Sequence, residues 1–166
     1  MRDAIEEYIV RTLSTDVRLN EGLPRSVFVE AGMPQERPDR QLQVWVHEGP
    51  STNFEQDYIE GGDDVSVQGI TEWSVSCRVM LVGPVEDLYA VLRTLTRNVF
   101  RVLRDLVEAP SDETDPAYPY WGYAQVNGFG QPYALMRSAN GARVLMGVQQ
   151  EIAYQVRWVG TWEIGD

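Results

Sequence analysis

Two segments of the chain repeat their apolar residues at helical spacing. Residues 3–14 carry apolar side chains on one side, and Asp3 is placed to cap this helix at the end where the helix dipole favours acids. Residues 86–107 show the clearest helical pattern of the chain. Its narrow apolar arc consists of Leu88, Leu92, Leu95, Val99, Val102, Leu103 and Leu106. We therefore expect a short N-terminal helix and one long amphipathic helix.

Alternating or short apolar runs in the first half predict strands. Residues 27–29 form a short apolar run, and residues 41–47 alternate between apolar and polar positions. Residues 73–82 give the clearest alternation of the first half and end before Gly83-Pro84. The intervening residues 48–66 contain several glycines and a proline, so they are predicted to form a long loop.

The second half predicts a terminal group of strands. A second long connecting segment is expected at 110–132. Its acidic part, 111–119, is predicted to be loop, and the aromatic part that follows is predicted to be strand and turn. Asn140-Gly141 separates two apolar runs and supplies the two positive φ angles of a type I′ hairpin. The last strand alternates from Ile152 to Ile164.

These elements predict a single α+β domain over residues 1–166, since that length is ordinary for one domain. We expect a mixed or antiparallel sheet with both helices packed on one face. The other face and the long β-hairpin loops are then left for partners.

Composition narrows the class of protein. The chain is 43% hydrophobic and 23% charged, which is typical of a soluble globular protein. Its longest aliphatic run, Val79 to Val82, is far too short to cross a membrane, and the acidic N-terminus lacks the features of a signal peptide, so we expect the chain in a cytoplasm. Cys77 is the single cysteine, which excludes an internal disulfide and a multi-cysteine metal site.

The charge is strongly acidic. Twenty-five Asp and Glu residues against 14 basic residues, all of them arginine, give a net charge of −11. Tight nucleic-acid binding depends on clustered cations that release counterions, so this balance disfavours it. DNA could still pass such a surface without being held.

Candidate catalytic and metal-binding residues are few. His47 is the single histidine and could act as a general base, but no nucleophile accompanies it in the sequence. Residues 60–64, with Asp63 and Asp64, resemble the Gly-Gly-Asp-Glu hairpin of diguanylate cyclases, yet the chain lacks lysine and the upstream metal-binding aspartate, so we predict a turn.

A calcium site is the other metal hypothesis. Glu108, Asp112, Glu113 and Asp115 supply the oxygen ligands that calcium takes, but their spacing is not that of an EF-hand loop. We interpret this segment as a solvated acidic loop. The sequence thus predicts no catalytic residue, no cofactor site and no metal site.

Candidate interaction residues are more numerous. An arginine ridge on the long helix is formed by Arg93, Arg97, Arg101 and Arg104. It is either a solvated face, a contact with the acidic loop at 108–115 of a neighbouring subunit, or a phosphate-binding surface. The aromatic segment contains Tyr118, Tyr120, Trp121, Tyr123 and Phe129, which serve as core residues, as platforms for sugars or bases, or as interface anchors. Asp63 and Asp64 complete the candidate interface.

The order of the elements resembles that of the tail terminator, or tail completion, proteins of long-tailed phages, as in lambda. The likeness covers nearly the whole chain and rests on pattern. The segments that carry it are the helix at 3–13, the entry with Pro34 and Pro38, the strand at 42–46, the long strand at 73–82, the helix at 86–107 and the strand group at 142–164.

The resemblance implies a structural protein of the virion neck, assembled in the host cytoplasm, and not an enzyme. It implies a homo-hexameric ring that caps the tail tube, stops polymerisation of the tail tube protein and joins the tail to the head-tail connector protein. DNA would pass through the acidic ring without specific binding. Another neck protein, such as a connector ring, and a cytosolic ligand-binding module are the alternative hypotheses, and an enzyme with an unrecognised site is a third.

Overall fold

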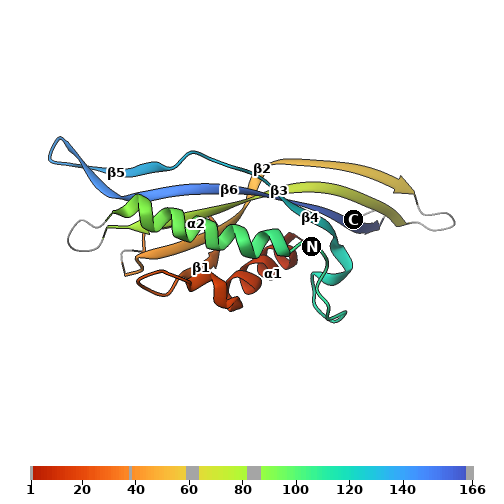
Figure 1. The fold of residues 1–166 in the computed structure, drawn as a ribbon. Coiled ribbons are helices and arrows are strands. Elements are labelled where there is room, and N and C mark those ends of the chain that lie inside the picture. Colours follow the sequence, from red (N-terminus) through yellow and green to blue (C-terminus); the bar gives the residue numbers. More distant parts are fainter. Residues whose placement is uncertain (1, 38, 59–63, 82–86, 164–166) are drawn as a thin grey trace.

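Two α-helices lie on the same face of one β-sheet in the computed structural model of the chain (Figure 1). The structure describes residues 2–37, 39–58, 64–81 and 87–163. The elements in chain order are α1 (Arg2–Thr15), the 3-10 turn η1 (Val17–Asn20), β1 (Phe28–Ala31), β2 (Leu42–Tyr58), β3 (Asp64–Met80), α2 (Leu88–Asp105), the 3-10 turn η2 (Tyr118–Tyr120), β4 (Trp121–Phe129), β5 (Tyr133–Ala139) and β6 (Ala142–Glu163). This arrangement confirms the predicted α+β class.

The sheet is built around β6. Its strand order is β1-β2-β3-β6-β4, and β5 pairs with β6 next to β4. Strand β3 follows one edge of β6 from Asp64↔Glu163 to Met80↔Gly147, while β4 and β5 share the other edge end to end. β1 and β2 are parallel and the other pairs are antiparallel, so the sheet is mixed, as predicted.

The core lies between the helices and the sheet. The whole apolar arc predicted for α2 is buried against the sheet. Asp87 caps the start of the helix by accepting from the Ala90 backbone N–H at 3.1 Å. Ile5, Ile9 and Leu13 of α1 are fully buried beside it. The expectation for Asp3 is wrong, since α1 begins at Arg2 and Asp3 lies within its first turn.

The long loop predicted at 48–66 is also wrong. β2 continues to Tyr58 and β3 begins at Asp64, and the two strands pair from Thr52↔Thr71 to Tyr58↔Val65 after an irregularity at Gly49. The turn predicted at 60–64 lies, apart from Asp64, outside the described residues. This end of the sheet projects past the helices (Figure 1), and residues 52–58 lack the apolar alternation by which a half-buried strand is recognised in a sequence.

The second predicted loop is partly wrong. Residues 121–129 of the segment 110–132 form β4, as the strand expected within its aromatic part suggested. The hairpin prediction is confirmed, because Asn140 and Gly141 have φ angles of 50° and 77° and directly join β5 to β6.

Candidate interaction surface

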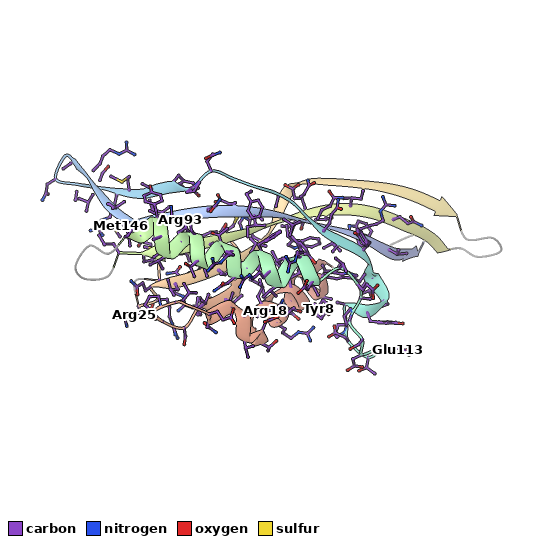
Figure 2. The ribbon with its side chains drawn as sticks, in the orientation of Figure 1. Tyr8, Arg18, Arg25, Arg93, Glu113 and Met146 are labelled. Carbon is purple, nitrogen blue, oxygen red and sulfur yellow. The ribbon has the colours of Figure 1, made fainter. Side chains whose placement is uncertain are left out.

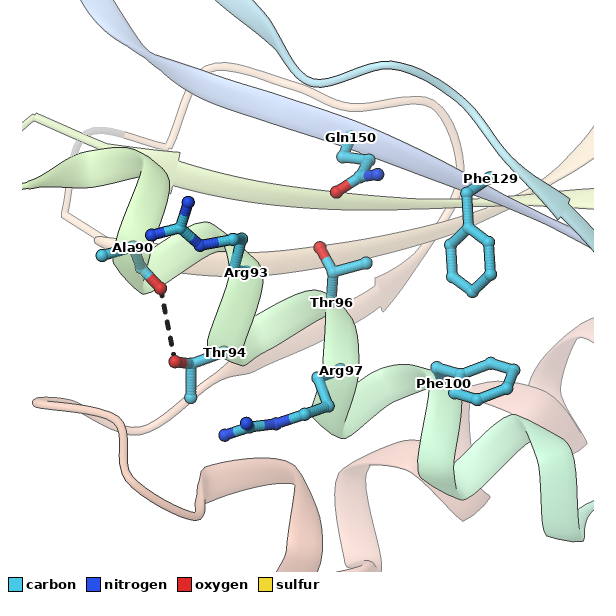
Figure 3. Close-up of a pocket in the computed structure, with 8 residues that line it drawn as sticks. All are labelled: Ala90, Arg93, Thr94, Thr96, Arg97, Phe100, Phe129 and Gln150. Atoms are coloured by element: carbon cyan, nitrogen blue, oxygen red, sulfur yellow. Dashed lines mark hydrogen bonds between the residues drawn. The ribbon is translucent and has the colours of Figure 1, made fainter.

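A groove lies between α2 and the sheet, next to the gap between the end of β4 and the start of β5. It has a volume of about 630 Å³. The residues that line it are Ala90, Arg93, Thr94, Thr96, Arg97, Phe100, Phe129 and Gln150. Figure 3 shows Phe100 and Phe129 together at one end, with the two arginine side chains extending from α2 at the other.

The predicted arginine ridge divides into two pairs. Arg101 lies 3.5 Å from Glu21, and Arg104 lies 3.6 Å from Asp105. Arg104 also stacks over the ring of Phe100, with 5.8 Å to its centroid. Arg93 and Arg97 are exposed and form no ion pair with any residue that the structure describes. The groove is therefore lined by the two arginines of the ridge that pair with no described carboxylate.

The aromatic segment is divided between core and surface. Trp121 is buried against the ring of Tyr8 at 5.3 Å in an edge-on arrangement, and Tyr120 packs against the same core. Tyr123 and Phe129 are about half exposed. The Phe129 ring lies 5.4 Å from that of Phe100, which brings the predicted aromatic segment to the groove.

The other predicted interface residues are placed only in part. Asp63 lies outside the described residues. Asp64 is the first residue of β3 and pairs with Glu163 of β6. It therefore lies on the projecting end of the sheet, far from the groove.

The acidic loop after α2 is held by defined hydrogen bonds. Both carboxylate oxygens of Asp115 accept from the Arg11 guanidinium, at 2.8 and 3.1 Å, which lowers the pKa of Asp115. Asp112 accepts from the Thr114 hydroxyl at 2.7 Å. Two of the four carboxylates considered as calcium ligands, Asp112 and Asp115, thus have protein partners. Within the described ranges no three His, Cys, Asp or Glu side chains gather as metal ligands.

A polar network covers the sheet face opposite the helices. Arg78 donates to Gln149 at 2.7 Å, and Gln149 donates to both Tyr133 and Glu151 at 2.7 Å. The Tyr133 hydroxyl donates to Glu151 at 2.7 Å, and burial together with this hydrogen bond raises the pKa of Tyr133 to about 12. Sequence alternation indicates which face these residues share, but the contacts depend on strands far apart in the chain.

His47 lies on that same face and is half-buried. Burial lowers the pKa of His47, while the charge of Glu151 opposes the shift, so the imidazole is neutral at neutral pH. Its Nδ1 is buried and has no hydrogen-bond partner among the described residues. A general base is normally oriented by a hydrogen bond at this nitrogen, and His47 lacks one there.

Comparison with known proteins adds no family. The described part of the chain contains no helix with the length and apolarity needed to cross a membrane. No model of a known protein family matches the sequence, and no curated protein matches it. The surface must therefore be interpreted from its own geometry.

Proposed function

We propose that this chain is a tail terminator of a long-tailed phage, a structural subunit that assembles into a hexameric ring. The ring caps the tail tube, stops its growth and presents a surface to the head connector. The proposal rests on the resemblance in element order together with one structural observation: strands of the sheet extend past the helical layer at both of its ends (Figure 1).

The β5–β6 hairpin supports this proposal at one end. Its tip carries residues that are exposed on both strands, including Met136 and Val144 at 41% each. A two-stranded hairpin without a core beneath it is only marginally stable in water. Such an extension contributes little to the fold of one subunit, and exposed apolar side chains on it suit a contact with a neighbour.

The extended β2–β3 pair supports it at the other end. β1 covers the outer edge of β2 only from Gln43 to Val46. From Thr52 to Tyr58 the outer edge of β2 has no partner among the described strands. An unpaired edge offers backbone N–H and C=O groups to a strand of another chain, which is a common way for subunits to join.

The charge of the chain fits a ring around DNA. A subunit of net charge −11 gives a ring whose channel repels phosphates, so DNA passes through without being held. The same charge argues against a role as a DNA-binding clamp. We propose no reaction for this chain, and its role is assembly.

Arrest of tube growth tests the proposal. The purified chain is added to tail tube protein from the same genome while the tube polymerises, and tube lengths are measured by electron microscopy. We expect tubes that stop growing and carry a ring at one end. Tubes that keep growing without a terminal ring contradict the proposal. Binding to isolated head connectors but not to tube ends would favour a connector ring instead.

The groove favours one second candidate, a ligand-binding module. Its volume of about 630 Å³ falls within the range of small-molecule sites, and its two arginines suit an anion. A module of this kind stays monomeric and gains thermal stability with small anionic ligands. A terminator subunit associates with itself, so the two candidates differ in a simple measurement.

A further inference from the structure

We propose that the groove of one subunit receives the acidic loop at 108–115 of the next subunit in the ring. This inference rests on the proposed function and names the contact that joins neighbouring copies. The groove supplies Arg93 and Arg97, and the loop supplies Glu108 and Glu113.

Charge complementarity is the first support. Arg93 and Arg97 are exposed and form no ion pair within the described part of the chain, although the protein carries 25 acidic residues. Glu108 and Glu113 are exposed as well and likewise have no ion-pair partner among the residues described. The fold therefore leaves two cations in a groove and two anions on a loop, and none of the four has an ion-pair partner among the described residues of its own subunit.

The loop is preformed for docking. Arg11 of α1 holds Asp115 through two hydrogen bonds, and the Asp115 backbone N–H bonds to the Asp112 carbonyl at 3.0 Å. Ala117, at the base of the loop, is fully buried. Because the loop is already ordered, docking it costs less conformational entropy than docking a free segment.

Exposed aromatic side chains lie beside the charged residues on both surfaces. Tyr118 follows the loop and is 38% exposed, while Phe129 at the groove is 52% exposed and packs on Phe100. An exposed tyrosine beside the acids and the exposed Phe129 beside the arginines allow ring contacts around the charged pairs.

The two surfaces lie too far apart to meet within one chain. Arg93 is near the start of α2 and Asp105 ends it, which separates them by about 18 Å at 1.5 Å per residue. The loop begins beyond that end, and Figure 2 shows Glu113 at its tip, well away from Arg93. Complementary patches at different places on one subunit form a head-to-tail contact, which closes into a ring when the rotation permits.

Charge reversal on each side tests the contact. One variant carries Arg93→Glu and Arg97→Glu, and the other carries Glu108→Arg and Glu113→Arg. Each alone should weaken self-association at least tenfold, because its groove and loop then carry like charges. Mixed in equal amounts, the two variants should form alternating rings, since every groove again meets a loop of opposite charge.

The control variant carries Arg25→Glu and Arg157→Glu at two exposed arginines outside the groove, which lowers the net charge by as much as the groove variant does. It should associate like the natural chain. Oligomers are measured by native mass spectrometry, and circular dichroism checks that each variant folds. If the natural chain forms rings and both reversed variants do so too, the inference is wrong while the proposed function stands. If the natural chain forms no ring, both fail.

Discussion

The indole ring of Trp158 in β6 lies directly over Gly69, its partner across the ladder in β3. A Cβ atom at Gly69 would lie 2.2 Å from Cζ2 of Trp158. The ring is nearly buried, and its Nε1 donates to the Thr71 hydroxyl at 2.8 Å. This pair fixes how β3 and β6 meet at the point where the sheet leaves the helices.

Gly69→Ala should therefore destabilise the fold. The added methyl group must displace a large, hydrogen-bonded ring, so we expect a loss of about 1 to 3 kcal/mol in the free energy of unfolding. Urea denaturation measures this loss. Gly128→Ala in β4 is the matched control, since a Cβ there meets nothing within 4 Å. Equal stabilities of the two variants would contradict the packing described for Trp158.

Asn98 ties α2 to the turn after α1. Its buried amide donates to the Leu19 carbonyl at 3.0 Å and to the Glu21 carbonyl at 2.8 Å. Asn98→Ala removes both bonds and leaves these carbonyls without that donor, which should cost about 2 to 3 kcal/mol. Thermal or urea unfolding gives the value, and the exposed Asn127→Ala should change it little. A loss for Asn98→Ala no larger than for Asn127→Ala would argue against the link.

The Asn140-Gly141 turn gives a local prediction. Gly141 has a φ of 77°, and a Cβ atom there would meet nothing within 4 Å, so the cost of Gly141→Val comes from holding a left-handed backbone. The cost is about 1 to 2 kcal/mol, and it should appear as faster hydrogen exchange in residues 133–148. Asn140→Gly keeps both positive φ angles and should leave exchange unchanged. Slow exchange in the Gly141→Val hairpin would contradict this assignment.

Cys77 should be protected in the folded protein. Burial raises the pKa of the Cys77 thiol to about 12, so the thiolate is scarce at pH 8 and the sulfur is inaccessible. A thiol reagent should label the native chain much more slowly than the chain in urea. Rapid labelling of the native chain at pH 8 would show that the thiol is exposed.

The raised pKa of Cys77 also makes the stability of the fold depend on pH. The folded pKa lies above the unfolded value of 9.0, so the protonated thiol contributes stability that is complete below pH 9 and is lost as the pH rises toward 12. Cys77→Val removes that part of the alkaline loss. If both proteins lost stability equally between pH 8 and 10, Cys77 would not be the group responsible.

The sequence predicts the helices and the parts of strands that the helices cover. It misses the strand ends that lie beyond the helices. The apolar arc of α2 and the alternation of the strand predicted at 73–82 are readable because their apolar residues are buried against each other. The structure places that strand within β3, which ends at Met80. The strand ends at 48–58 and 64–72 extend away from the helices, and residues such as Gly49 and Gly69 further obscured the alternation.

The sequence predicts single residues of the candidate surface but not the contacts that bring them together. Helical spacing places Arg93 and Arg97 on the outer side of α2. Nothing in the spacing brings Phe129 of β4 to Phe100 of α2, because that contact depends on the order β3-β6-β4 in the sheet. Trp121 and Phe129 look alike in sequence, yet the first is buried and the second exposed.

Native mass spectrometry of the purified chain over a concentration series measures ring assembly itself. We expect a hexamer that dominates by about 100 µM, where an interface with a micromolar Kd is largely occupied. Negative-stain images of that species should show a ring with an open centre. A chain that stays monomeric over the whole series would contradict ring assembly.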